Sequence, residues 1–244
     1  MEGKKYILVL TLTLLSCFVF GQNNKSIYNA YVSGNMHRWK TAMDSVDALE
    51  QKINKEVLDL INYQYGYIAW CIGSSEEEEA EKYLNKATIN LEKLEQKKYN
   101  ESMLLAYKAA FIGFEIGLAK YKAPFIGMNS LEYAKKSVSI DASNALGYMQ
   151  LGNIYFYMPK MIGGSKTEAL AYYLKALTLM ESNEEYKTSN WNYLNLLATI
   201  INAYIELNKY EEAKKYSIKT LTIEPGFDWV KNNLYPKILK NSTK

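Results

Sequence analysis

Residues 148–177 read YMQLGNIYFYMPKMIGGSKTEALAYYLKAL, and this stretch decides the fold. Two sets of residues recur in it at the spacing of one helical face, with large and small side chains interleaved. They are Tyr148, Leu151, Gly152 and Tyr155 in the first half, and Ala169, Tyr173, Ala176 and Leu177 in the second. Gly and Ala let two helices approach closely while aromatic rings fill the remaining gap. The stretch therefore predicts a helix-turn-helix unit.

The pattern of the second helix recurs along the chain. It consists of small or apolar residues at relative positions 0, 4 and 7, which form one stripe of a helix. The further stripes are Ala42, Val46 and Leu49; Ala80, Leu84 and Ala87; Ser130, Ala134 and Ser137; and Ala213, Ser217 and Thr220. A polar N-cap with Glu three residues on predicts helix starts at Ser75, Asn129, Ser165 and Asn208.

These residues together resemble the tetratricopeptide repeat (TPR) family, over most of the chain after the first few dozen residues. The stripes are spaced by more than the family's usual period of about 34 residues, so longer helices or loops are expected. The resemblance implies an all-α, right-handed superhelical solenoid of four to five helix pairs in one domain, residues 22–244. The segment with Trp229, Val230, Leu234 and Ile238 is expected to form a C-terminal capping helix.

The N-terminus has the features of a secretory signal peptide. Two lysines within residues 1–5 precede an apolar run at 6–20, followed by Gly21-Gln22. We expect cleavage after Gly21 and a periplasmic or secreted protein. Two alternatives are an uncleaved anchor and a lipoprotein, because Leu14-Leu15-Ser16-Cys17 resembles a lipobox whose Cys17 would carry the lipid.

Charge and cysteine content restrict the function classes further. Without residues 1–21 the chain would hold 27 basic and 25 acidic side chains, a net charge of +2, and no basic block that favours nucleic acid. Cys71 would be the single remaining cysteine, which excludes an internal disulfide. Its apolar neighbours Trp70 and Ile72 indicate a buried side chain.

Catalytic and metal-binding motifs are not found. His37 is the single histidine, no nucleophile motif accompanies it, and no Cys, His or carboxylate set has metal-site spacing. The run Glu76–Glu79 follows two serines and suits the positive end of a helix dipole. Gly163–Thr167 lacks the spacing of a phosphate-binding loop and is expected to be a loop with an N-cap. We expect no enzyme activity, cofactor or metal.

The TPR resemblance implies that first helices line a concave groove that binds an extended segment. The residues it places there are Met149, Asn153, Phe156 and Tyr157 in one unit, Asn202 in the next, and Tyr63, Tyr67 and Trp70 in an earlier one. The aromatic members could equally belong to the core. The two Asn residues are the more specific candidates, since an amide donates to and accepts from a peptide backbone at once.

Two apolar connections form a second candidate surface. Residues 122–128 and 158–164 each hold Pro, apolar residues and Gly, and both are expected as loops on one edge. Their exposed candidates are Phe125, Ile126, Met161 and Ile162, unless these side chains fold back over the helix ends. The second loop vaguely resembles one in periplasmic TPR subunits of TRAP-type transporters.

The sequence thus predicts a non-enzymatic protein-protein interaction scaffold of the cell envelope, which binds a peptide or protein through the groove or the loop edge. One alternative is a periplasmic subunit that binds a small ligand for a transporter. Another is an oligomer subunit whose groove is filled by its own chain.

Overall fold

The computed structural model describes residues 23–186 and 188–242, and every regular element in these ranges is helical. The all-α prediction is therefore confirmed. The predicted signal peptide, including Cys17, lies outside the described residues. Among the described helices, none is both long and apolar enough to cross a membrane.

The helices follow one another with short connections. An N-terminal helix covers residues 23–32 and is followed by α2 (Met36–Asp47), α3 (Asn54–Gly73), α4 (Glu77–Gln96), α5 (Glu101–Leu118), α6 (Ala123–Ile140), α7 (Ala145–Tyr157), α8 (Lys166–Glu181), α9 (Trp191–Glu206), α10 (Tyr210–Ile223) and α11 (Tyr235–Ser242). Single 3-10 turns lie at Lys120–Lys122, Lys160–Ile162 and Glu184–Tyr186, and a π-helical turn lies at Val230–Leu234.

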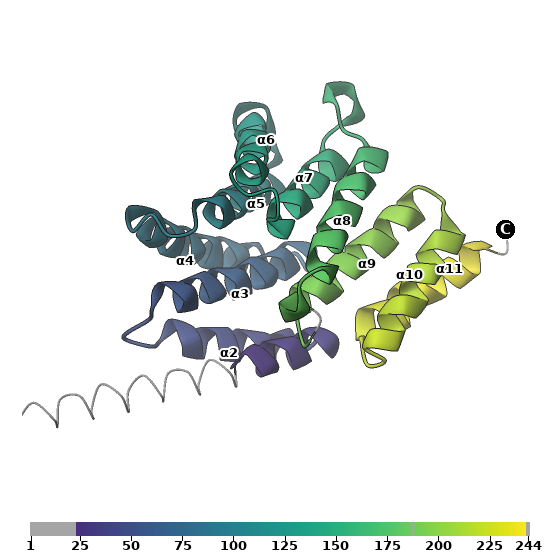
Figure 1. Cartoon of the computed structure of the whole chain (residues 1–244), viewed down its shortest axis with the longest axis horizontal. Helices are drawn as coiled ribbons and strands as arrows, with labels where there is room; N and C mark the ends of the chain where they lie inside the picture. The colour runs from purple at the N-terminus through teal and green to yellow at the C-terminus, as the bar shows by residue number, and fades with distance from the viewer. Residues whose placement is uncertain (1–22, 187, 243–244) are drawn as a thin grey trace, which may run out of the picture.

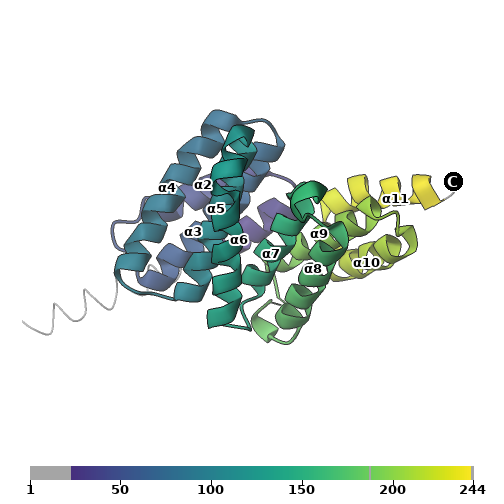
Figure 2. The same ribbon diagram turned by 90° about the horizontal axis from the view of Figure 1, so that it is seen from above.

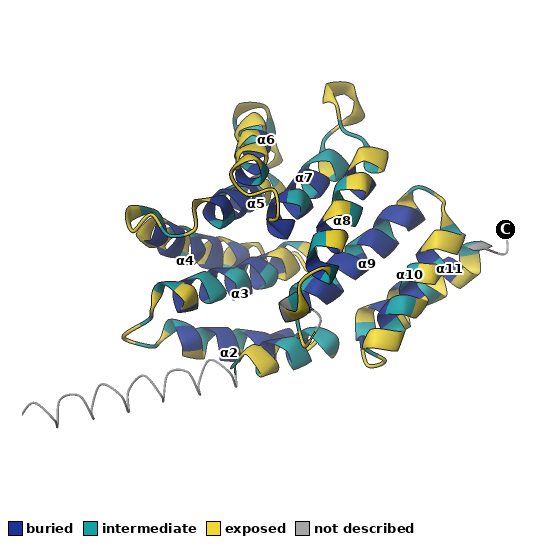
Figure 3. Cartoon of the chain, in the orientation of Figure 1, coloured by how far each residue is buried: buried dark blue, intermediate teal, exposed yellow. Residues whose placement is uncertain are grey.

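Successive helices pack as hairpins. The tightest neighbours are α3 with α4, α5 with α6, α7 with α8, and α9 with α10, and Figures 1 and 2 show these pairs side by side. Figure 3 shows that buried residues line the faces on which the helices meet. The stripe residues on α4, α6, α8 and α10 are all buried, as helix-packing positions require. On α2, Ala42 and Val46 are buried, whereas Leu49 follows the end of that helix.

Gly152 and Gly66 allow close contacts between helices. A Cβ on Gly152 would lie 2.4 Å from the ring of Tyr173, so α7 and α8 can meet at this distance because Gly152 has none. A Cβ on Gly66 would lie 2.7 Å from the rings of both Trp39 and Trp191. Ala169 begins the α8 stripe that also contains Tyr173, and it is fully buried. Small residues thus set the spacing of the helices.

The prediction of helix starts was right at one position in four. Ser165 caps α8, accepting a hydrogen bond from the Glu168 backbone N–H at 3.2 Å. Ser75 and Asn208 instead have positive φ angles of 60° and 57° and end α3 and α9. In both turns the next N–H bonds back into the preceding helix, from Glu76 to Cys71 and from Lys209 to Tyr204. This is the left-handed C-terminal turn of a helix, which Asn and Gly favour.

The fourth expected cap, Asn129, lies inside α6, because that helix begins six residues earlier. Pro124 occupies the first turn of α6, where its missing N–H costs no intrahelical bond. The segment 122–128 is therefore the start of a helix and not the predicted loop. Phe125 and Ile126 project from its first turn.

The C-terminal segment packs over the last hairpin, as the capping-helix prediction requires. Val230, Leu234 and Ile238 are buried against α10 and α9, while Trp229 is partly exposed. Pro236 is the second residue after the π-helical turn Val230–Leu234. Pro lacks a backbone N–H and therefore interrupts the regular series of hydrogen bonds in a helix. The π-helical turn lies next to this interruption.

The N-terminal helix joins the two ends of the array. The Tyr28 hydroxyl donates to Glu224 at 2.8 Å, and the Tyr31 hydroxyl donates to Asn195 at 3.0 Å. The Tyr31 ring also lies 5.2 Å from that of Phe227. We call these contacts the clasp. They connect residues almost two hundred positions apart in the sequence and hold the first helices against α9 and the turn after α10.

Candidate functional site

Aromatic side chains fill the space between the N-terminal helix, α2, α3 and α9. The rings of Trp39 and Trp191 meet edge to face at 4.9 Å, and Tyr31 lies 5.6 Å from Trp191. Tyr65 adds a further ring at 6.4 Å from Trp191. These side chains pack against one another, so the chain itself occupies this part of the inner surface.

Four predicted groove residues lie farther along, on α7 and α9. Asn153 and Tyr157 share one face of α7 at i and i+4, and Phe156 lies beside them. Asn202 shares a face of α9 with Glu206, again four residues on. Lys166 at the start of α8 joins the two helices, with its ammonium 2.5 Å from a Glu206 carboxylate oxygen and 5.4 Å from the centre of the Phe156 ring. We call Asn153, Phe156, Tyr157, Lys166, Asn202 and Glu206 the α7–α9 patch.

The charges in this patch are balanced. The hydrogen bond from Lys166 lowers the pKa of the Glu206 carboxyl, so this carboxyl is ionised at neutral pH. Tyr157 is 78% exposed, yet the protein atoms around its phenol, and then the charge of Glu206, raise its pKa. Its hydroxyl therefore stays protonated and able to donate. The patch offers an accessible ring, a phenol donor and an ion pair.

The two Asn residues of the patch are in different situations. The amide of Asn153 is bonded within the chain: its Nδ2 donates to Gln150 at 3.1 Å and its Oδ1 accepts from the Tyr173 hydroxyl at 2.9 Å. Gln150 in turn donates to the Tyr65 hydroxyl at 3.2 Å. Asn202 is half-buried and makes no side-chain hydrogen bond to any residue that the structure describes. Asn202 is thus the amide that remains available to a partner.

The second predicted surface lies where α5 joins α6 and where α7 joins α8. Because α6 runs back along α5 and α7 runs back along α6, both connections lie on the same edge of the molecule (Figure 2). Five large apolar side chains are exposed there. They are Tyr121, Phe125, Met128, Met161 and Ile162, which we call the apolar rim. Met161 is 97% exposed and Phe125 is 81% exposed, whereas Ile126 is half-buried.

Backbone bonds hold the α7–α8 part of the rim in shape. The Ser165 N–H donates to Tyr155 at 2.9 Å and closes the loop at its base, while the Gly164 N–H donates to Pro159 at 3.1 Å. Gly163 has a φ of 106°, and a Cβ on Gly164 would lie 1.8 Å from the Met158 carbonyl oxygen. The loop therefore needs both glycines. Met161 and Ile162 project from a closed turn.

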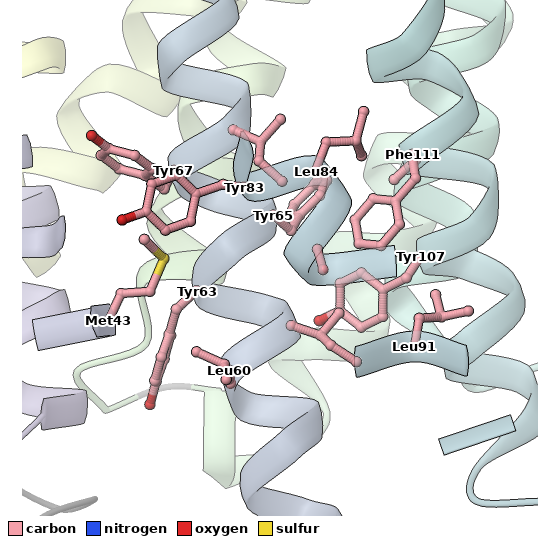
Figure 4. Packing of buried hydrophobic residues seen from close by; sticks show 14 of the residues in the cluster. Met43, Leu60, Tyr63, Tyr65, Tyr67, Tyr83, Leu84, Leu91, Tyr107 and Phe111 are labelled. Atoms are coloured by element: carbon pink, nitrogen blue, oxygen red, sulfur yellow. The ribbon is translucent and has the colours of Figure 1, made fainter. Parts of the chain in front are cut away.

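The remaining predicted site residues belong mainly to the core. Tyr63, Tyr67 and Met149 are buried, and Figure 4 shows Tyr63 and Tyr67 among the packed side chains of α2, α3 and α4. Trp70 lies 5.7 Å from Tyr67 and is partly exposed beside Glu76–Glu79. The aromatic residues predicted on one face of α3 thus fill the contact between helices, which was the alternative interpretation of this stripe.

The described residues include one cysteine, Cys71, and one histidine, His37. Cys71 is buried, and burial raises the pKa of its thiol to about 11, so little thiolate forms at neutral pH. His37 is exposed on α2. Within the described part of the chain, no three His, Cys, Asp or Glu side chains are grouped to hold a metal ion.

Sequence reasoning missed Tyr121 of the rim and Lys166 of the patch, and it included Met128 in the segment 122–128 without naming it as an exposed candidate. Met128 and Phe125 come together on α6 because this helix begins earlier than expected. Tyr121 lies in the 3-10 turn just before it. Lys166 was assigned only to a helix start. Its role depends on the neighbouring hairpin, which spacing along the sequence does not reveal.

No protein-family model and no curated protein sequence matches the chain. Among solved structures, the chain is similar to the HusA haemophore from Porphyromonas gingivalis, with a TM-score of 0.60 and 14% sequence identity. The match covers 76% of this chain and 92% of the haemophore. At this identity the similarity shows a shared helical fold.

Proposed function

We propose that this protein is an exported, non-enzymatic binding protein with a TPR-like superhelix of helix pairs, and that it binds a peptide or protein segment at the α7–α9 patch. The observation that carries the proposal is the exposed ring of Tyr157 close to Glu206, with the free amide of Asn202 one helical turn before Glu206 on α9. An extended segment would exchange backbone hydrogen bonds with this amide and lay a side chain against Tyr157 and Phe156. The buried helix stripes and paired helices support the TPR-like part of the proposal.

The test replaces Asn202 and Tyr157 by Ala in the chain from residue 22 onward. Partners captured from the producing cell's own envelope are crosslinked, identified by mass spectrometry and then titrated as purified proteins. We expect the double variant to weaken binding by about 1–3 kcal/mol with unchanged thermal stability. Ile53→Ala with Ile89→Ala is the matched control, because both side chains are exposed far from the patch. Equal binding by wild type and double variant would remove the patch from consideration.

A second candidate function is the capture of a flat, apolar ligand of the haem class. The fold similarity to a haemophore favours it, and so does the chemistry of the patch. Phe156 and Tyr157 could cover the face of a macrocycle, and Lys166 could pair with a ligand carboxylate after leaving Glu206. This is the small-ligand alternative to the scaffold, and it needs no protein partner.

Haemin titration separates the two functions. Capture of haem predicts a shifted Soret band that saturates near one haem per chain, and a loss of about tenfold in affinity for Tyr157→Ala. Phe125→Ala serves as the control for nonspecific stacking on an exposed ring. Unsaturable binding, or equal loss in both variants, would speak for adsorption and against a haem site.

A further inference from the structure

The apolar rim has a shape that differs from that of a protein-binding groove. Its side chains project separately, and Met161 and Phe125 are almost free of neighbours. They come from two stiff connections on one edge, one beginning with the 3-10 turn Lys120–Lys122 and the other closed by the Gly163-Gly164 turn. A rigid partner would need a separate pocket for each of these side chains. A fluid apolar phase accepts them without such pockets.

Lysines lie beside the rim. Segments 116–131 and 156–167 contain Lys120, Lys122, Lys160 and Lys166, and the acidic residues Glu115, Glu132 and Glu168 lie just outside them. Lys122 pairs with Glu115 at 3.5 Å and Lys166 with Glu206, whereas Lys120 and Lys160 make no ion pair with any described residue. These two free ammonium groups flank Tyr121 and Met161 directly in the sequence. A chain of net charge +3 thus presents local positive charge beside its most exposed apolar side chains.

We propose that the apolar rim docks onto the surface of an anionic phospholipid bilayer. Phe125, Met161 and Ile162 enter the boundary between headgroups and acyl chains, and Tyr121 stays at the level of the headgroups. Lys120 and Lys160 lie against lipid phosphates, with their alkyl stems beside the apolar residues. The acidic turn Glu76–Glu79 begins α4, and in the proposed orientation it faces away from the lipid.

This docking is independent of the function proposed above. The rim and the α7–α9 patch share no residue, and a chain held at a bilayer through its rim would still present Asn202 and Tyr157. Peripheral contact of this kind is reversible, since a few partly inserted side chains contribute far less than a spanning helix.

Vesicle sedimentation tests the proposal with the chain from residue 22 onward. Vesicles of phosphatidylcholine alone are compared with vesicles that contain one third phosphatidylglycerol, at low and high salt. We expect binding to the anionic vesicles, weakened by salt because the lysine contribution is screened. Phe125→Ser with Met161→Ser should lower the partition coefficient about tenfold. Lys120→Ser with Lys160→Ser should lower it about fivefold for each lysine.

Ile53→Ser with Ile218→Ser is the matched control, because both side chains are exposed and lie away from the rim. It should bind like the wild type. Absence of wild-type binding to anionic vesicles overturns the proposal, as does equal binding by the rim and control variants. If the rim variants change the oligomeric state in gel filtration and leave vesicle binding unchanged, the rim is a protein interface and the proposal fails. Lys120→Ser with Lys160→Ser leaves the apolar side chains intact. It therefore remains informative if Phe125→Ser with Met161→Ser folds poorly.

Discussion

At the residue scale, a single missing methyl group sets the distance between α7 and α8. Tyr173 lies flat against the backbone at Gly152, and its hydroxyl continues into the Asn153 and Gln150 amides. One contact therefore combines close packing with a polar network that reaches Tyr65 on α3. Such a network is stable only when every member keeps its partner.

Gly152→Ala should destabilise the protein by about 1–3 kcal/mol, because the added Cβ would meet the Tyr173 ring at 2.4 Å. For a chain of this size, each kcal/mol lowers the melting midpoint by about 2–4 °C. Gly113→Ala is the control, and we expect it to change stability in the opposite direction. Nothing lies within 4 Å of a Cβ at this helical position, so the variant should gain about 0.5–1 kcal/mol. Calorimetry of both variants decides; a higher midpoint for Gly152→Ala would contradict the packing described.

Sequence reasoning could locate these small residues but could not tell groove from core. Tyr63 and Tyr67 have the same periodicity as a binding stripe, and they are buried because α2 and α4 cover them. Asn153 and Asn202 occupy matching positions, yet only the first has its amide satisfied within the chain. Which helix covers a face is decided by the arrangement of the hairpins, and this information is not local in sequence.

At the element scale, the helix stripes were predictable and the helix starts were not. The stripes depend on which residues are buried, which periodicity reports directly. A start depends on backbone conformation in the turn, and Ser75 and Asn208 serve to end the preceding helices there. Asn129 has the pattern of a cap, but Pro124 starts α6 before it. Polar residues near helix ends thus have several roles that a short motif does not separate.

The four candidate caps give a direct test of this difference. Ser165→Ala should cost about 1 kcal/mol, since it removes the acceptor for the Glu168 N–H at the start of α8. Asn129→Ala, at an exposed position inside α6, should change stability by less than about 0.5 kcal/mol or raise it, because Ala is the better helix former. Urea unfolding of the two variants measures both. A larger loss for Asn129→Ala would mean that α6 begins later than described.

At the scale of the whole molecule, the sequence predicted an all-helical chain of packed pairs but gave no sign of the clasp. Tyr28 and Tyr31 belong to a short helix, and their hydroxyls bond to Glu224 and Asn195. No local pattern links segments so far apart. The clasp also explains why the middle of the array is filled: it brings Trp191 onto Trp39 and Gly66.

Breaking the clasp should loosen both ends of the chain together. Tyr31→Ala removes contacts with Trp39, Trp191, Phe227 and Asn195, and we expect a loss of about 2–4 kcal/mol. In hydrogen exchange, the N-terminal helix and α9 to α11 should lose protection in parallel. Tyr121→Ala is the control, since that ring is exposed and should have little effect on stability. Faster exchange in the N-terminal helix alone would show that the clasp does not couple the ends.

The clasp has a consequence for how this architecture can change in evolution. Open helical arrays lengthen or shorten by duplicating or deleting a unit, because each unit contacts only its neighbours. Here the first helix must meet α9 and the turn that carries Phe227, so an inserted hairpin would carry these partners out of reach of Tyr28 and Tyr31. The number of hairpins is thereby fixed by closure. Homologues should differ in loop length and surface residues while keeping the same count of helices.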